Sequence, residues 1–170
     1  MIARNMAPGL RRTFSFEEWN WMDDRLIHEV RQEASRKINR EIELDIMGTD
    51  IDARMVEIAK ENAQKAGVSS DITFKQMRVQ DLHSDKINGV IISNPPYGER
   101  LEDQETLPQL YTEMKEAFDR LDTWSKYVIT SYEDTEKYLG KPTKKRKVYN
   151  GMIRGEFYQY LGPKPPRRRK

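Results

Sequence analysis

The sequence predicts an α/β fold built on a mostly parallel sheet that ends in an antiparallel hairpin. Two observations lead to this prediction. Short apolar runs of strand character alternate along the chain with longer segments of helical periodicity. Near the carboxyl end, two strongly alternating runs flank the stretch NGMIRG, which is typical of a hairpin. With 170 residues, the chain has the length of one domain with a single core.

The first expected elements are a short helix over residues 1–5, a long helix over residues 16–39, and a strand over residues 42–49. Pro8 and Gly9 mark the loop between the two helices. The long helix is indicated by apolar residues that recur at spacings of three and four, which makes one stripe: Trp19, Met22, Leu26, Val30 and Ala34.

The first strand reads IELDIMGT and ends in Asp50. Asp52 can cap a helix that runs to Ala66, and Gly67 stands where a helix often stops in the left-handed conformation. The remaining expected elements are a short strand at 72–77, a buried strand at 89–93, a helix at 106–121, a strand at 127–131, helical turns at 134–139, and hairpin strands at 145–149 and 156–160.

Three polar residues are expected where strands end, and in parallel α/β sheets ligands bind beyond those ends. Asp50 can accept hydrogen bonds from the hydroxyls of a ribose, although it can equally cap the following helix, a role for which Asp52 competes. Asp81, in VQDLH, can accept from an adenine amino group, but an ordinary turn aspartate is the more frequent case. The third residue is Asn94, which directly follows the strand predicted at 89–93.

The stretch IISNPPYGERL leaves its strand through a stiff corner, because two prolines cannot continue a ladder. The Asn94 side-chain oxygen and the Pro95 carbonyl, spaced by Pro95 and Pro96, can both accept hydrogen bonds from one exocyclic amino group. Such acceptors orient the nitrogen lone pair and stabilise developing positive charge. Tyr97 offers a flat face for stacking a base. An aromatic turn that merely closes a strand is the simpler alternative.

Composition excludes several classes of protein. The chain has no cysteine and only two histidines, His28 and His83, which argues against disulfides and against a metal centre. No apolar run approaches the ~20 residues that span a membrane, and no signal-peptide core is present. We therefore expect no membrane partner and a cytoplasmic location.

Charge is distributed unevenly. Residues 141–170 hold eleven lysines and arginines against one acid, Glu156, for a local charge of +10, whereas the first 140 residues hold 19 basic and 27 acidic side chains, or −8. A basic end on an acidic body suggests a polyanion partner. The terminal PKPPRRRK is equally consistent with a solvated, disordered tail over residues 162–170.

Several motifs carry a family resemblance. SNPPYGERL resembles the fourth motif of class I S-adenosylmethionine-dependent methyltransferases that act on exocyclic amino groups. GTDIDARMVEIAKENAQKAGV resembles the strand and helix around their second motif, and VQDLH their third. Residues 1–161 are similar to the carboxyl-terminal catalytic part of bacterial THUMP-domain 23S rRNA guanine-N2 methyltransferases, which implies a partial methyltransferase domain of the Rossmann-like class.

The resemblance implies roles for particular residues. S-adenosyl-L-methionine would be the cofactor, with its ribose on Asp50 and its adenine on Asp81, and 23S rRNA or its precursor particle would be the partner. The target base would lie at the catalytic corner. The implied cofactor-binding residues are Asp50, Ile51, Asp81, Leu82 and Asn94, and the implied catalytic residues are Asn94, Pro95, Pro96 and Tyr97.

The sequence departs from the family at its first motif, a strand followed by a glycine-rich turn. No two of the nine glycines stand two positions apart, so G-x-G occurs nowhere. We expect the chain to be a fragment truncated before the first strand, with two strand edges left unpaired, self-association through those edges, and no activity on its own. N6-adenine methylation of DNA or RNA and noncatalytic RNA binding remain as alternatives.

Overall fold

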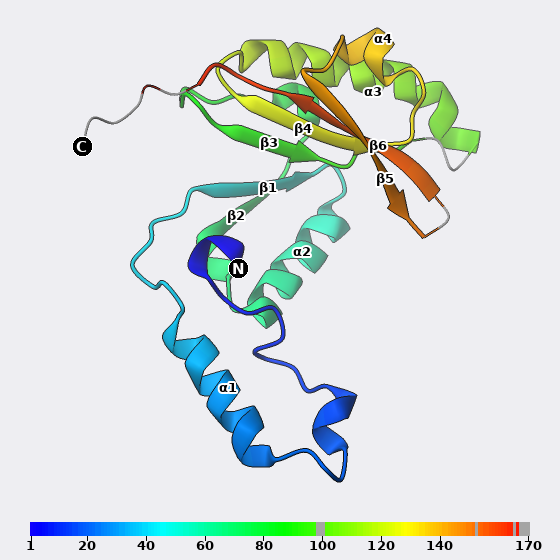
Figure 1. Ribbon diagram of the computed structural model, residues 1–170. Coiled ribbons are helices and arrows are strands. Elements are labelled where there is room, and N and C mark those ends of the chain that lie inside the picture. The colour runs from blue at the N-terminus through cyan, green and yellow to red at the C-terminus, as the bar shows by residue number, and fades with distance from the viewer. Residues whose placement is uncertain (98–100, 152, 165, 167–170) are drawn as a thin grey trace. The chain divides into compact units, whose positions relative to one another are not determined.

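The computed structural model describes residues 1–97, 101–151, 153–164 and 166 (Figure 1). The chain divides into two compact units, Met1–Met77 and Arg78–Lys170. Within the described ranges, no helix is long and apolar enough to cross a membrane. Of the tail predicted at 162–170, residue 165 and residues 167–170 lie outside the described part.

The first unit contains a two-stranded parallel sheet with a helix between its strands in sequence. β1 (Ile46–Asp50) pairs with β2 (Ile72–Gln76), so that Ile46 faces Ile72 and Asp50 faces Gln76. α2 (Ala53–Ala66) joins them and packs against both. Its predicted ends are confirmed: the Asp52 side chain accepts from the Arg54 N–H, and Gly67 has φ 71°.

The long helix predicted over residues 16–39 was wrong in its first part. A 3-10 helix covers Ser15–Glu18, and α1 begins only at Asp24 and ends at Arg36. The reason is local: Asp23 Oδ1 accepts from the Arg25 N–H at 2.8 Å, which caps α1 there. A further 3-10 helix, Ile2–Arg4, replaces the predicted helix at 1–5.

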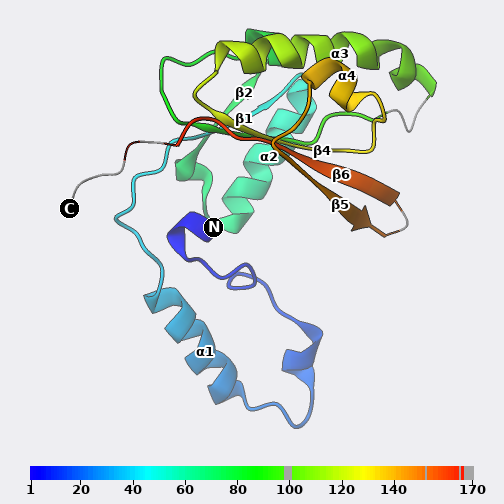
Figure 2. The ribbon, with the colours of Figure 1, turned by 45° about the horizontal axis from the view of Figure 1, so that its top comes forward.

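The second unit is a four-stranded sheet with the strand order β3-β4-β6-β5. β3 and β4 run parallel, whereas β6 is antiparallel to both β4 and β5, as the hairpin prediction required. Figures 1 and 2 show α3 and α4 together on one face of this sheet. The bounds are β3 Val90–Ser93, α3 Leu101–Arg120, β4 Ser125–Thr130, α4 Thr135–Leu139, β5 Lys144–Asn150 and β6 Ile153–Tyr160.

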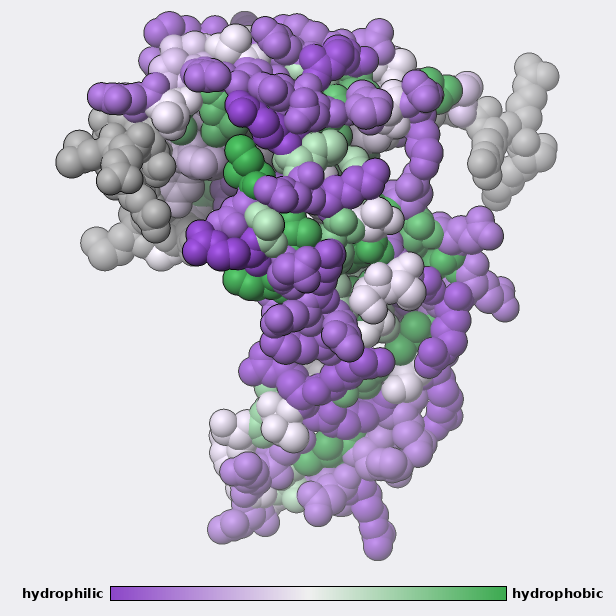
Figure 3. Space-filling view, turned by 180° about the vertical axis from the view of Figure 1, so that it is seen from behind, coloured by the Kyte–Doolittle hydropathy of each residue, from purple (hydrophilic) through white to green (hydrophobic). Residues whose placement is uncertain are grey.

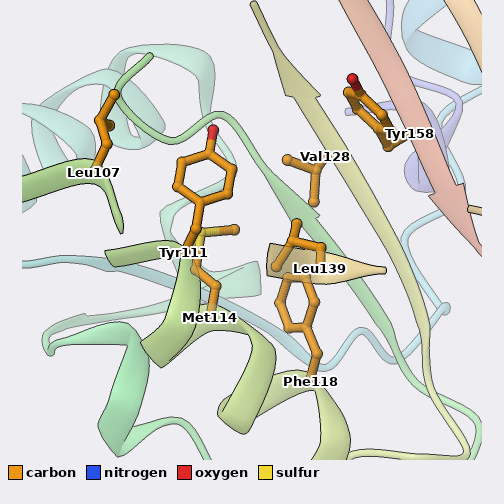
Figure 4. Packing of buried hydrophobic residues seen from close by; sticks show 7 residues of the cluster. All are labelled: Leu107, Tyr111, Met114, Phe118, Val128, Leu139 and Tyr158. Carbon is orange, nitrogen blue, oxygen red and sulfur yellow. The ribbon is translucent and has the colours of Figure 1, made fainter. Parts of the chain in front are cut away.

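The core of the second unit lies under α3 (Figure 4). Leu107, Tyr111, Met114 and Phe118 follow one another at spacings of four, three and four, so one stripe of the helix faces the sheet. These side chains meet three others from β4, α4 and β6, namely Val128, Leu139 and Tyr158. α3 therefore holds the sheet and α4 together.

Other predicted element starts and one predicted burial were also wrong. α3 begins at Leu101 rather than at 106, with Pro108 inside it, β1 begins at Ile46 rather than at 42, and β6 begins at Ile153 rather than at 156. The strand predicted as buried is open on one face: Val90 is 57% exposed and Ile92 79%. The cause is register, because these two residues alternate with the ones that face α3.

The strands of the described chain form two separate sheets, of two and four strands. β1 bonds only to β2, and β3 bonds only to β4, so each of these strands has one unpaired edge within the described chain. Figure 3 shows hydrophobic side chains reaching the surface between hydrophilic ones. Large apolar side chains that are exposed on the strands include Ile46, Met47, Val90 and Ile92.

Candidate functional site

Asp50 is the last residue of β1, and the β1 exit is tied firmly to the end of β2. The Asp50 carbonyl accepts from the Met77 N–H at 2.9 Å, and Gln76 Nε2 donates to the Ile51 carbonyl at 3.0 Å. Asp50 Oδ1 accepts from the Asp52 N–H at 2.8 Å. Both Asp50 and Ile51 are exposed, so this turn presents a carboxylate and an apolar side chain to solvent.

The structure separates the roles of the two competing aspartates. Asp52 caps α2 and also pairs with Arg54, whose Nη2 lies 3.0 Å from Asp52 Oδ2. The hydrogen bonds from Arg54 lower the pKa of Asp52. Because Asp52 performs the capping, Asp50 is not needed for it. Asp50 Oδ2 has no hydrogen-bond donor among the described residues and is available to a ligand hydroxyl.

Asp81 ends a 3-10 helix, Val79–Asp81, at the start of the second unit. Arg120 of α3 donates through Nη2 to the carbonyls of Gln80 and Leu82, which clamps this turn to the helix. The Asp81 carbonyl lies 2.9 Å from His83 Nδ1. The Asp81 carboxylate is exposed and forms no hydrogen bond or ion pair within the described chain, whereas Leu82 is half-buried beside it.

The corner from Asn94 to Tyr97 follows β3 directly. Pro95 is buried, Asn94 and Pro96 are exposed, and Tyr97 is half-buried. Within the described residues, neither the Asn94 side chain nor the Pro95 carbonyl takes part in a hydrogen bond. The two acceptors that the sequence predicts for an amino group therefore both lack a donor from the described residues.

The corner is held in place by two buried residues that the sequence did not indicate, Tyr111 and Thr130. The Tyr111 hydroxyl donates to the Pro96 carbonyl at 3.5 Å and lies 2.7 Å from Thr130 Oγ1. Thr130 Oγ1 in turn accepts from the Tyr132 N–H at 3.1 Å. The three hydrogen bonds are compatible when the Thr130 hydroxyl donates to the Tyr111 oxygen. Each of the two hydroxyls then donates one hydrogen bond and accepts one.

This anchor is internal to the protein and uncharged. Tyr111 is 0% exposed and Thr130 2%. Burial raises the pKa of the Tyr111 hydroxyl, which keeps it protonated and able to donate at neutral pH. The only signal in the sequence was a tyrosine in the apolar stripe of a helix, since a buried tyrosine hydroxyl normally finds a polar partner.

The candidate residues fall into groups, one on the first unit and two on the second. Asp50 and Ile51 belong to the first unit, and Asp81, Leu82 and the corner Asn94–Tyr97 belong to the second. No hydrogen bond links Asp81 or Leu82 to the corner in the described chain. No group of three or more histidine, cysteine or acidic side chains suited to a metal ion occurs among the described residues.

Comparisons of sequence and of structure both match this chain to proteins that are named as methyltransferases. The family model "RMKL-like, methyltransferase domain" matches residues 1–159. "Putative RNA methyltransferase YpsC" of Bacillus subtilis is 47% identical over the whole of this chain, which covers 44% of that protein. "Ribosomal RNA large subunit methyltransferase K/L" of Shewanella sp. (strain ANA-3) is 34% identical over 94% of this chain and 23% of its own length.

One solved structure shares the fold closely. The crystal structure of SMU.472, described as "a putative methyltransferase complexed with SAH", superposes with a TM-score of 0.91 at 49% identity. The match covers 98% of this chain and 44% of that one. The chain thus spans less than half the length of each of these three proteins.

Proposed function

The chain belongs to the family of RMKL-like methyltransferase domains, and on that premise we propose that it carries part of the active site of an RNA methyltransferase. The proposed reaction transfers a methyl group from S-adenosyl-L-methionine to the exocyclic N2 of a guanine in 23S rRNA. The names of two relatives, an RNA methyltransferase and a large-subunit rRNA methyltransferase, support an RNA substrate.

The observation that carries this proposal is the hydrogen bonding of the corner Asn94–Tyr97, which follows β3. The Pro96 carbonyl is engaged by Tyr111, whereas the Asn94 side chain and the Pro95 carbonyl have no donors in the described chain. Two neighbouring acceptors suit the two hydrogens of an amino group. They would orient its nitrogen and stabilise the positive charge that develops on it. Tyr97 would stack on the extruded base.

The residues at the strand exits fit the proposed cofactor. Asp50 retains a carboxylate oxygen for ribose hydroxyls because Asp52 performs the capping, and Ile51 is 62% exposed next to it. The exposed Asp81 carboxylate can accept from an adenine amino group, with the apolar Leu82 beside it. When bound, S-adenosylmethionine supplies an activated methyl group. A solved relative named as a complex with SAH supports this choice of cofactor.

We also propose that this set of residues is incomplete. The sequence has no G-x-G, so the glycine-rich turn that would lie under the methionine end of the cofactor is not among these residues. Activity would then require a strand and such a turn in addition. A cytoplasmic location follows from the proposed substrate.

The test is to identify the methylated nucleoside. RNA is incubated with labelled S-adenosylmethionine and either this chain or an amino-terminally extended version that adds a strand and a glycine-rich turn, then digested and analysed by mass spectrometry. We expect N2-methylguanosine from the extended version, lost on Asn94→Ala and retained in the control Asn62→Ala on α2.

Other outcomes decide among the alternatives. N6-methyladenosine would replace guanine by adenine as the target, since the same corner can accept either amino group. RNA binding without any methylated product in either version would favour a noncatalytic RNA-binding module. Methyl transfer that survives Asn94→Ala would show that the corner is not the catalytic element.

A further inference from the structure

The β5–β6 hairpin carries an unusual number of cations on an outer strand. β5 begins with four consecutive basic residues, Lys144–Lys147, and all four are exposed. It is the last strand in the order β3-β4-β6-β5, so it bonds to β6 alone. A lysine-rich edge can simply discourage pairing with other strands. The positions and partners of these cations decide between that role and binding.

Register divides the β5 cations between the two faces of the sheet. Lys145 and Lys147 stand opposite Tyr158 and Glu156, on the face that packs against α3 and α4. Lys144 and Arg146 stand opposite Gln159 and Phe157 on the other face. On that second face the strand residues in register are Tyr127, Ile129, Phe157 and Gln159, and none of them is acidic.

Most of these cations have no partner of their own. Lys145 is neutralised, because its Nζ lies 2.6 Å from Glu136 Oε1. Glu156, the acid opposite Lys147, already pairs with Arg154 at 3.3 Å. Lys144, Arg146 and Lys147 form no ion pair with any residue in the described part of the chain. We call these three side chains the β5 strip; Lys144 and Arg146 lie on one face of this outer strand and Lys147 on the other, so together they flank its free edge.

The β5 strip lies level with the corner across the sheet. Ser93, the last residue of β3, pairs with Val128, so Asn94 follows at the height of Ile129. Ile129 pairs with Phe157, and Phe157 pairs with Arg146. With strands about 4.8 Å apart, β5 lies about 14 Å from β3 along this row. That separation corresponds to a few nucleotides of an RNA strand.

We propose that the β5 strip binds the phosphates of the RNA strand that flanks the target base. The proposal rests on the proposed function, which makes the polyanion RNA and places its reacting base at Asn94. Tyr149, 69% exposed beyond Lys147, offers a neighbouring ring on which a flanking base can stack. Phosphate contacts of this kind fix the register of the RNA without reading its sequence.

The experiment measures RNA binding by this chain directly, without requiring catalysis. Fluorescence anisotropy of a labelled, guanosine-containing single-stranded RNA is followed over a series of salt concentrations. For single strands, each lost phosphate contact lowers the slope of log K against log salt by about 0.7. We expect K144Q/R146Q/K147Q to lower that slope by about 2.

The matched control removes the same charge elsewhere. R25Q/K60Q/K65Q replaces three exposed cations on α1 and α2 and should leave the slope unchanged. An equal decrease of the salt slope in both triple variants would show that net charge alone determines RNA binding, and it would overturn the proposal. An unchanged slope in the β5 variant, or no RNA binding by the wild-type chain, would overturn it as well. Circular dichroism confirms that both variants fold.

The outcome is separable from that of the proposed function. If the β5 strip binds RNA but the extended version yields no methylated guanine, the RNA-binding proposal stands and the proposed methyl transfer is rejected. If the extended version forms N2-methylguanosine but K144Q/R146Q/K147Q keeps the wild-type salt slope, the proposed methyl transfer stands and the RNA-binding role of the β5 strip is rejected.

Discussion

At the scale of single residues, Asp50 and Asp52 show how two adjacent carboxylates can have separate tasks. Asp52 holds the first turn of α2, and Asp50 holds the turn before it while keeping one oxygen without a donor from the described chain. Asp52 therefore has the structural role, and the ligand role that we propose falls to Asp50.

The first prediction compares substitutions of these two residues. Asp50→Asn keeps an oxygen for the Asp52 N–H but removes the charge, so in the extended version it should weaken S-adenosylmethionine binding about 10- to 100-fold with little change in stability. Asp52→Ala should lower the unfolding midpoint with little change in binding. Calorimetry and thermal melts check both, and the reverse pattern would refute the assignment.

The second prediction concerns the anchor beneath the corner. Tyr111→Phe and Thr130→Val each remove one partner of the buried 2.7 Å hydrogen bond, so each should cost about 1–2 kcal/mol of stability. Because the two residues share this bond, the double variant should cost less than the sum by about 0.5–1 kcal/mol. Denaturant unfolding measures the cycle. Strict additivity would show that the hydroxyls are not coupled.

At the scale of elements, the first unit is held to its amino-terminal segment by an ion pair. Arg4 donates from Nε and Nη2 to the Asp71 carboxylate at 2.6 and 2.5 Å, which joins the first 3-10 helix to the turn after α2. The hydrogen bond from Arg4 lowers the pKa of Asp71.

The third prediction follows from the sign of this shift. Because the pKa of Asp71 is lower in the folded chain than the ~3.9 of an unfolded one, the pair stabilises fully above that value. The stabilisation is lost as pH falls through the folded pKa. Melts from pH 7 to 3 should show a smaller acid-induced decrease in Asp71→Asn than in the wild type. Parallel pH profiles would contradict the prediction.

The open edge and face of β3 lead to the fourth prediction. A strand that has one unpaired edge and exposes Val90 and Ile92 is a template for pairing with another chain, so this chain should self-associate as its concentration rises. Ile92→Lys should reduce that association. Sedimentation velocity checks it, with Ile87→Lys, 72% exposed in a loop, as the control. Equal sedimentation of all three chains at every concentration would reject the idea.

At the scale of the whole molecule, local chemistry made much of the fold predictable. Asp52, Gly67 and the alternation around NGMIRG each act within a few residues, and the elements they define were correctly placed. The start of α1 was misplaced because Asp23 competes with an apolar stripe for control of the helix end. The exposure of Ile92 was not predictable from its run of apolar neighbours, because it depends on which strands pair.

The candidate site was predictable to a similar extent. Proline stiffness and strand-exit position pointed to Asn94–Tyr97 and to both aspartates, since these are local features. The Tyr111–Thr130 anchor joins residues 19 apart in sequence, and a helix stripe does not reveal which hydroxyl meets which. Asp50 lies on the first unit and Asp81 on the second.

Calorimetric titration of S-adenosylmethionine tests the central claim most directly, because it asks whether these residues form an incomplete cofactor site. The ligand is titrated into this chain and, in parallel, into the version extended by a strand and a glycine-rich turn. The account predicts binding by the extended version alone, weakened by Asp50→Asn. Equal binding by both versions, or by neither, would contradict it.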